Sequence, residues 1–586
     1  MLFRELADTY ERLEATSSRL EMTDILAEAF RRFDPSDIKV AVYLTQGQLY
    51  PDFNPLKLGM ADKMILKAIA FASGAGESFV QDLMLKEGDP GIVAQKAFLN
   101  KKQTTLFSSE PLTLKRAYET LEAIARSEGG GSQDMKIKLM AKLLGDASSS
   151  EAKFLSRVIT GRMRLGVSSM TVLDALAVAF ATKDDRDAVE RAFNVSSDLG
   201  LVAEEMARHG LDGVKKIHVQ VNRPLRAMLA ERMSSPEEIL EKMGGTCAFE
   251  YKYDGVRIQA HICRGEVRLF SRKLDELTTQ FPDVVVGLKR TIKADSAIIE
   301  GECVPVDQNT GEFLPFQEVS HRRGRKHGVD EAVEDYPVKL CLFDCILKDG
   351  EDLTDRPFLQ RREALLSIVE PDDSVTLSEI RVLSSADEAQ AFFQEAIKDG
   401  CEGLMAKSLA DTSVYRAGNR GFLWIKYKKE YRSEMNDTVD LVVVGAFAGR
   451  GKRKGFYGAL LTATYDTAAD RFQTVSKLGS GFDDANLAAL LETLASDRIP
   501  EKHHLVDSKM EADFWFQPRL VLEVRGAEIT LSPIHTCSFG LIRPDSGLAI
   551  RFPRFTGRFR DDKEGRDATT SQELLSMYQG QLKRVE

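Results

Sequence analysis

Residues 250–257, with the sequence Glu-Tyr-Lys-Tyr-Asp-Gly-Val-Arg, isolate one lysine among groups that could activate it as a nucleophile. A lysine with an ordinary pKa of about 10.4 is neutral in only about one molecule in 2,500 at pH 7. Attack by Lys252 therefore requires a depressed pKa or a charged neighbour that drives the proton off. Arg257 and a bound divalent cation would supply that charge. The same stretch is also typical of a surface β-strand that ends in an Asp-Gly turn, with the lysine pointing outward.

Five further clusters follow, and each supplies a group that nucleotidyl transfer to a lysine needs. In chain order they are Ser271-Arg272, Glu300-Gly301-Glu302, Phe343-Asp344, residues 402–407 (Glu-Gly-Leu-Met-Ala-Lys) and residues 424–428 (Trp-Ile-Lys-Tyr-Lys). With residues 313–317 (Phe-Leu-Pro-Phe-Gln) and 551–555 (Arg-Phe-Pro-Arg-Phe), this ordered series resembles the ATP-dependent DNA ligases, most closely the long archaeal and eukaryotic replicative type. The resemblance extends over essentially the whole chain.

The resemblance implies a reaction in three steps. Lys252 attacks the α-phosphate of ATP and releases pyrophosphate, AMP passes to a DNA 5′-phosphate, and the 3′-hydroxyl displaces AMP and seals the nick. Such an enzyme serves DNA replication, repair, recombination and cell division. Lowering the lysine pKa from about 10.4 to near 7 corresponds to roughly 4–5 kcal/mol, which favours a metal ion together with an arginine or lysine over one neighbouring charge.

The resemblance also implies roles for side chains around the nucleotide. Glu250 is expected to contact adenine, and Phe343 offers a flat apolar face for stacking. The expected ligands of Mg²⁺ or Mn²⁺ are Glu302 and Glu402, because such a cation prefers a few carboxylates and takes phosphate oxygens to complete its coordination shell. Glu302 is also expected to bind ATP. The cations expected to hold ribose or phosphate are Arg257, Arg272, Arg420, Lys426 and Lys428.

Three cations near the C-terminus match the last motif of the family and would orient the pyrophosphate leaving group: Arg551, Arg554 and Lys563. They follow Lys252 by about 300 residues. They can reach ATP only if the C-terminal domain folds over the nucleotide and later swings away. The pivot is expected at residues 429–433.

Changes in residue pattern along the chain predict a multidomain protein with three parts. Residues 1–215 carry helical periodicity, as at Leu114, Ala117, Tyr118 and Leu121. Residues 216–430 mix β-branched runs with helices, which predicts an α+β fold. Residues 431–586 contain short strands separated by glycines and a closing helix, as in a β-barrel of the OB-fold type. By resemblance these are an all-α DNA-binding domain, a nucleotidyltransferase (adenylation) domain and an OB-fold domain.

Two stretches of the helical part are candidates for gripping a DNA backbone. Glycines 129–131 precede a predicted helix, where free N–H groups can approach a phosphate; the candidate residues in the two stretches are Gly130, Ser132, Lys136, Arg162 and Arg164. Without the resemblance, flexible connectors are the favoured interpretation of both stretches. The net charge of −10 argues against a nucleic-acid partner, but basic clusters at 321–326 and 450–454 could line one face.

Composition predicts a cytoplasmic protein without a membrane partner. The seven cysteines form no Cys-x-x-Cys pair, so neither a zinc site nor a disulfide framework is indicated. The N-terminus is charged and amphipathic, unlike a signal sequence, and no uncharged apolar run approaches the roughly 18 residues of a membrane span. The expected partners are nicked duplex DNA and a sliding clamp, and the protein is expected to be a monomer. The clamp would bind Gln103, Leu106 and Phe107. The same short pattern is as typical of an ordinary loop without a partner.

Three other functions compete with the DNA ligase. An RNA ligase and a capping guanylyltransferase share the lysine core, but the long helical region before Lys252 disfavours both. A nick-binding scaffold without catalysis is disfavoured because every expected catalytic residue is present. The absence of a cysteine zinc module favours ATP over NAD as the co-substrate, while use of ADP or GTP stays open.

Overall fold

The computed structural model describes residues 1–99, 110–306, 313–314, 316, 319, 322, 328–428, 438–449, 453, 455–526, 528–551 and 553–583. The chain divides into two compact units, Met1–Lys426 and Tyr427–Glu586. Within the described ranges, no helix is both long enough and apolar enough to span a membrane.

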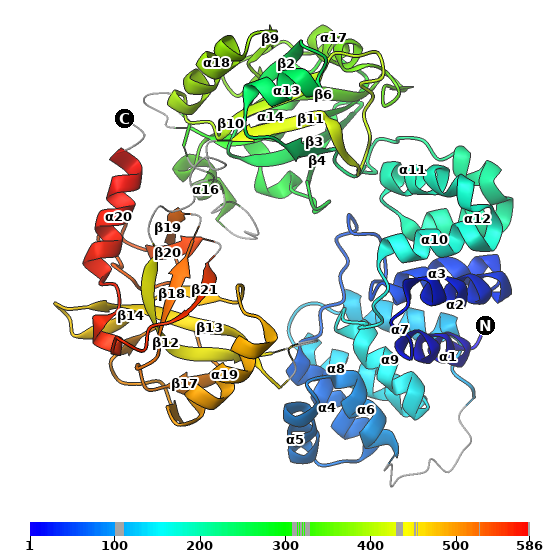
Figure 1. Ribbon diagram of the computed structural model, residues 1–586. Helices are drawn as coiled ribbons and strands as arrows, with labels where there is room; N and C mark the ends of the chain where they lie inside the picture. Colours follow the sequence, from blue (N-terminus) through cyan, green and yellow to red (C-terminus); the bar gives the residue numbers. More distant parts are fainter. Residues whose placement is uncertain are drawn as a thin grey trace. The chain divides into compact units, whose positions relative to one another are not determined.

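Helices α1 to α12 form the N-terminal region of the first unit, blue to cyan in Figure 1. Their bounds are α1 Phe3–Glu14, α2 Arg19–Arg32, α3 Pro35–Thr45, α4 Asp62–Ser73, α5 Glu77–Glu87, α6 Pro90–Leu99, α7 Leu114–Arg126, α8 Ser132–Gly145, α9 Ser149–Ile159, α10 Ser169–Phe180, α11 Arg186–Ser196 and α12 Leu199–Lys215. Several begin at a capping side chain: Ser18, Asp34, Thr113 and Ser148 each accept a hydrogen bond from a backbone N–H in the first turn. The all-helical prediction for this region is confirmed.

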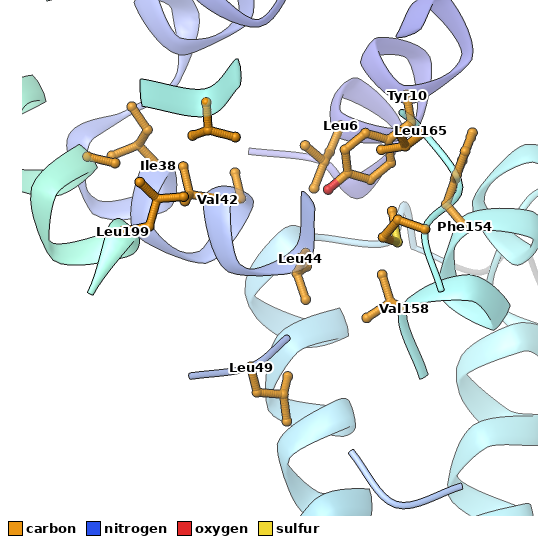
Figure 2. Close-up of a cluster of buried hydrophobic side chains, with 14 of the residues drawn as sticks. Leu6, Tyr10, Ile38, Val42, Leu44, Leu49, Phe154, Val158, Leu165 and Leu199 are labelled. Atoms are coloured by element: carbon orange, nitrogen blue, oxygen red, sulfur yellow. The ribbon is translucent and has the colours of Figure 1, made fainter. Parts of the chain in front are cut away.

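Amphipathic helices bury one face each to build the core of this region. Figure 2 shows side chains of α1, α3 and α9 meeting there, including Leu6, Tyr10, Leu44 and Phe154. The rings of Tyr10 and Phe154 meet edge to face with centroids 5.2 Å apart. Buried residues of α1 recur three and four positions apart, as a helix with one apolar stripe requires.

The rest of the first unit contains two β-sheets with helices, which confirms the α+β prediction. The five-stranded sheet has the order β1 (Leu229–Arg232), β11 (Arg420–Lys428), β10 (Gly403–Ser408), β2 (Cys247–Lys252), β9 (Ile380–Leu383). The second sheet has the order β4 (Glu266–Ser271), β3 (Val256–Cys263), β5 (Ser296–Pro305), β6 (Val338–Lys348), β7 (Glu351–Asp352), and β8 (Val375–Leu377) pairs with β6. The accompanying helices are α13 (Pro236–Lys242), α14 (Pro282–Thr291), α16 (Val329–Asp335), α17 (Phe358–Ile368) and α18 (Ala386–Lys398).

The chain crosses from one sheet to the other within the stretch 250–257. Strand β2 ends at Lys252 in the five-stranded sheet, and β3 begins at Val256 in the other sheet. Gly255 lies in this crossing, where a Cβ atom would come within 2.3 Å of the backbone oxygen of Cys303. Only glycine fits so close to a neighbouring backbone. The lysine is therefore held at the junction of two sheets.

The helical region packs against the sheet region inside the first unit. The Arg226 N–H donates to the Asn194 carbonyl of α11 at 2.8 Å, and the Arg226 guanidinium lies 4.2 Å from the Phe193 ring centre. A Cβ atom on Gly418 would come within 2.4 Å of the Asn194 side-chain oxygen. The segment around Arg226 therefore joins the last helices to the strands.

The second unit is built mainly from antiparallel strands. One sheet has the order β15 (Arg498–Ile499), β17 (Phe514–Phe516), β12 (Val439–Ala448), β13 (Tyr457–Asp466), β14 (Arg471–Leu478), β16 (Val506–Asp507), with β18 (Val521–Arg525) joining β12 to β21 (Arg554–Phe559). Strands β19 (Glu528–Ser532) and β20 (Gly547–Arg551) form a separate pair. Helix α19 spans Asp484–Ala495, and the C-terminal helix α20 spans Ser571–Lys583, where a closing helix was predicted.

Several sequence predictions fall outside the described residues. These are the clamp-binding loop with Gln103, Leu106 and Phe107, the pivot at 429–433, and most of the basic clusters at 321–326 and 450–454.

Replacing Leu44 by alanine should destabilise the helical region by about 2–5 kcal/mol, because the side chain is fully buried and truncation leaves a cavity. The midpoint of the urea transition followed by circular dichroism measures the loss. Leu85→Ala is the matched control, since Leu85 is 87% exposed and should leave the midpoint unchanged. Equal shifts for both variants would contradict the helical core.

Candidate active site

Lys252 is partly buried and paired with a carboxylate. Its Nζ lies 2.6 Å from Glu402 Oε2, and its side chain is 21% exposed. The backbone completes the contact, because the Glu402 N–H donates to the Lys252 carbonyl at 2.8 Å. Lys252 does end a strand before an Asp-Gly turn, as the alternative interpretation required, but it does not lie on an open surface.

The surroundings of Lys252 hold its proton in place. Burial lowers the pKa of Lys252, but the charges of Glu402 and Glu302 outweigh it and leave the pKa above its ordinary value. Arg257, together with a bound divalent cation, was expected to drive the proton off, and this stays a prediction. Its guanidinium is 2.7 Å from Glu300 Oε2, so a buried carboxylate offsets its charge.

The carboxylates around Lys252 are themselves perturbed. Burial raises the pKa of Glu302 to about 7, against the lowering effect of Lys252 and Arg257. Burial and the charge of Glu402 raise the pKa of Asp254 to about 6. Like charges in a poorly solvated site disfavour one another's ionisation. The cluster of Asp254, Glu302 and Glu402 therefore carries more negative charge than the lysine alone offsets.

This cluster suits a divalent cation only with help from a substrate. Within the described ranges, no three His, Cys, Asp or Glu side chains are grouped as ligands of a preformed metal site. Mg²⁺ commonly binds through one or two carboxylates, with phosphate oxygens and water completing its shell. Glu302 and Glu402, whose charges both act on Lys252, fit that smaller contribution.

Arg257, Phe343 and Trp424 form a second group next to the lysine. The Arg257 guanidinium lies 5.3 Å from the Phe343 ring centre and 5.4 Å from that of Trp424. The two rings meet edge to face with centroids 6.1 Å apart. Glu302 connects this group to the lysine, because both Arg257 and Lys252 lower its pKa. The structure therefore brings together five of the predicted residues: Lys252, Arg257, Glu302, Phe343 and Glu402.

Glu250 is buried in a network of its own. Its carboxylate lies 2.6 Å from Lys407 Nζ and accepts a hydrogen bond from the Ser378 hydroxyl. Lys407 is only 1% exposed and lies 4.9 Å from the Phe343 ring centre. Burial lowers the pKa of Lys407 although the charge of Glu250 opposes it. Glu250 thus reaches the Phe343 group through Lys407.

The remaining predicted phosphate ligands up to Lys428 are more dispersed. Arg272 lines a cavity of about 510 Å³ that it shares with Asp52 and Lys57 of the helical region. Arg420 lines a different cavity, of about 430 Å³, with Lys242 and Phe422. Lys426 and Lys428 lie two residues apart on β11, each half-buried; Lys426 is in register with Arg232 of β1.

The three predicted C-terminal cations belong to the second unit. Arg551 lies 2.5 Å from Glu528, and Lys563 lies 2.8 Å from Asp440, which also binds Arg560. Arg554 is exposed at the start of β21.

The predicted DNA-binding residues lie near helix ends, where Ser132 and Lys136 are half-buried and the others exposed. Gly130 is exposed, and Ser132 begins α8 directly after Gly131, whose φ of 80° favours glycine. Lys136 donates weakly to the Gly59 carbonyl at 3.5 Å. The remaining two are exposed arginines after α9: Arg162 is 3.4 Å from Asp62, and Arg164 donates to the Gly88 carbonyl at 2.8 Å.

Family models cover most of this architecture. Residues 227–428 match the ATP dependent DNA ligase domain, residues 2–177 match the DNA ligase N terminus, and residues 453–563 match the ATP dependent DNA ligase C terminal region. The first match contains both sheets and the whole lysine cluster. The chain belongs to the ATP-dependent DNA ligase family, which confirms the resemblance and makes the protein a ligase that uses ATP.

Curated relatives match over their full lengths. DNA ligase 2 of Thermofilum pendens is 51% identical, with 99% of this chain and 97% of the relative covered. DNA ligases of Caldivirga maquilingensis and Staphylothermus marinus are each 47% identical, with 98% or more of both chains covered. A solved structure described as Pmar-Lig_PreS3 has the same fold, with a TM-score of 0.52, 17% identity and coverage of 95% of this chain and 99% of that chain.

Sequence reasoning gave no role to three residues that complete the site. Asp254 adds a third carboxylate beside Lys252, Glu300 neutralises Arg257, and Tyr415 donates a hydrogen bond to Glu300 at 2.8 Å. Asp254 and Glu300 stood inside quoted motifs, so their positions were a usable signal. Tyr415 stood in no motif and could be found only from the fold.

Replacing Glu402 by glutamine should lower the pKa of Lys252, because it removes the largest charge that holds the proton on Nζ. Each unit of that fall makes the amine about tenfold more often neutral below its pKa. The rate of trinitrobenzenesulfonate labelling at Lys252 at pH 8, located by peptide mass spectrometry, should therefore rise. Glu351→Gln, at an exposed surface pair with Arg356, is the control and should not change it. Slower or unchanged labelling in Glu402→Gln would show that the pair does not control the proton.

Proposed function

We propose that the chain seals nicks in duplex DNA with ATP, through an AMP–Lys252 adduct and a DNA-adenylate. The observation that carries this proposal is the position of Lys252 within 2.6 Å of Glu402, with Glu302 linking it to the Arg257–Phe343 group. A covalent phosphoramidate stores the activation of ATP until DNA is bound. Membership of the ATP-dependent DNA ligase family supports the choice of both substrates.

The residues of the two-sheet region, up to Lys428, are proposed to act on the nucleotide. Phe343 stacks on the nucleoside, Glu250 and its backbone contact adenine, and Arg257 donates to the ribose or phosphates. Arg272, Arg420, Lys426 and Lys428 hold phosphate oxygens; Arg272 lines a cavity of about 510 Å³ and Arg420 one of about 430 Å³. Lys252 loses its proton to the carboxylate cluster and attacks the α-phosphorus, and the electron pair of the broken P–O bond leaves with pyrophosphate.

Glu302 and Glu402 are the proposed ligands of Mg²⁺, or of Mn²⁺ in its place. When bound, the cation supplies positive charge beside the phosphates and offsets the carboxylates that raise the pKa of Lys252. Lys252 is then free to give up its proton at a pH where the unliganded protein holds it.

The second unit is proposed to be an OB-fold domain that contributes to the first step. Its antiparallel β12–β13–β14 meander, with β18 and β21, suits this small barrel type. Arg551, Arg554 and Lys563 would orient the leaving pyrophosphate, and residues 429–433 would provide the pivot. The proposed domains are 1–215 for DNA binding, 216–430 for adenylation and 431–586 for the OB fold.

The helical region is proposed to hold the DNA through Gly130, Ser132, Lys136, Arg162 and Arg164. The protein would act as a cytoplasmic monomer in DNA replication, repair, recombination and cell division, with a sliding clamp bound through residues 103–107.

Lys252→Ala should abolish transfer of AMP to the protein from ATP radiolabelled at the α-phosphate, since no other group supplies the nucleophile. Affinity for nicked duplex DNA should stay within about twofold of the wild type, because it depends mainly on many phosphate contacts. Gel electrophoresis of the denatured protein measures the adduct, and fluorescence anisotropy measures DNA binding. Lys339→Ala, in the same sheet region but outside the cluster, should keep the adduct. Labelling of Lys252→Ala at the wild-type level would refute the assignment.

Arg554→Ala should slow self-adenylation by at least tenfold yet seal a pre-adenylated nick at close to the wild-type rate. The reason is that its proposed contact is with pyrophosphate, which has left before the last step. Single-turnover assays of both steps separate the two effects. Arg558→Ala, on the same strand and paired with Glu523, is the control. An equal loss in both assays would make Arg554 a general DNA contact instead.

A further inference from the structure

Tyr415 lies buried between β10 and β11, with only 4% of its surface exposed. Its ring meets Trp424 edge to face, with centroids 6.0 Å apart. The Arg361 guanidinium lies 5.7 Å from the centre of the Tyr415 ring. The side chain is therefore fixed by packing, and its hydroxyl has a defined place.

The Tyr415 hydroxyl contacts Arg257 and two of the groups around it. It donates to Glu300 Oε2 at 2.8 Å and accepts from the Met228 N–H at 3.0 Å. Arg257 Nη2 approaches the same oxygen at 3.4 Å. Burial raises the pKa of Tyr415 well above its ordinary value, so the hydroxyl keeps the proton that it donates.

The same partners hold the Arg257 guanidinium directly. Its Nη2 donates to Glu300 at 2.7 Å, and its Nη1 donates to the Met228 carbonyl at 2.9 Å. The Tyr415 hydroxyl therefore binds both Glu300 and the backbone of Met228, the two groups that hold Arg257. Among the described residues, the buried Arg257 Nε–H has no hydrogen-bond partner, which leaves one donor for a ligand oxygen.

We propose that Tyr415 is a positioning residue for the nucleotide, acting through Arg257. This inference rests on the proposed function, in which Arg257 donates to the ribose or phosphates of ATP. A phenylalanine at 415 would keep the ring contacts with Trp424 and Arg361 but would leave the Glu300 carboxylate and the Met228 N–H each short of one partner. Arg257 would then lose its fixed direction beside the Phe343 ring, where the nucleoside stacks.

The network also ties Arg257 to the segment that joins the two regions of the first unit. Gln259 lies two residues after Arg257 on β3. Its side chain accepts a hydrogen bond from the Leu225 N–H at 2.9 Å and donates one to the Leu225 carbonyl at 3.3 Å. It also donates to Glu300 Oε1 at 3.3 Å. Gln259 and Arg257 of β3 thus hold residues 225–228 at Leu225 and Met228, and the Tyr415 hydroxyl adds a further hydrogen bond at Met228.

The test measures binding without catalysis. The ligand is an ATP analogue whose α,β-bridge is a methylene group, so Lys252 cannot displace pyrophosphate from it. Tyr415→Phe in the full chain should weaken the Kd about tenfold, the change expected when a hydrogen bond to charged groups is lost. Tyr10→Phe is the matched control, because Tyr10 is an equally buried tyrosine bonded to Thr45 in the helical region, and it should leave the Kd unchanged.

A double-mutant cycle separates positioning from general loss of structure. In an Arg257→Ala background, adding Tyr415→Phe should change the Kd no further, because the residue it acts through is gone. A tenfold loss in both backgrounds, or no loss in either, would overturn the proposal. If Tyr415→Phe fails to fold by circular dichroism, Glu300→Gln takes its place in the same cycle with the same expected and contradicting results.

Failure of the inference can be told from failure of the proposed function. Wild-type protein that forms no AMP adduct at Lys252 would overturn the proposed function. An adduct in the wild type, together with an unchanged Kd for Tyr415→Phe, would overturn only the role of Tyr415.

Discussion

The ion pair between Lys252 and Glu402 is the interaction on which the rest of the site depends. The strands place the lysine at the crossing between two sheets, and the ion pair compensates its ammonium group where water has limited access. An unpaired charge in that position would be costly. The same pair makes Lys252 less reactive, because the charge of Glu402 raises the pKa of the amine that must attack. The resting protein is therefore stable with a protonated, unreactive lysine, and reactivity must come with the substrate.

The two sides of the site solve the same electrostatic problem differently. Around Lys252, three carboxylates face one cation, and burial raises the pKa of both Asp254 and Glu302. Around Arg257, a single buried carboxylate and a tyrosine hydroxyl satisfy the cation and hold it against two aromatic rings. The first arrangement has negative charge to spare for a divalent cation, whereas the second is neutral and rigid. This division suits a reacting group on one side and a binding group on the other.

Much of this could be predicted from the sequence because it depends on local patterns. Helical periodicity predicted a helical region over residues 1–215, β-branched runs predicted the α+β region, and the ordered motifs indicated the family. The direction of the Lys252 pKa could not be predicted, since it depends on Glu302 and Glu402, which are distant in sequence and meet only through β5 and β10. The pairing of Arg257 with Glu300 could not be predicted for the same reason, because Glu300 lies on another strand. Tyr415 lies in a loop without periodicity, and only the packing of that loop against Met228 gives it a role.

The central claim is that Lys252, and no other buried lysine, carries the AMP. Lys407 is the informative alternative, because it is buried beside the same Phe343 ring and its pKa is lowered by burial. Wild-type protein incubated with ATP and Mg²⁺ and then digested can be examined by tandem mass spectrometry for peptides carrying AMP. The account predicts AMP on Lys252 alone. AMP on Lys407, or on any residue other than Lys252, would contradict it.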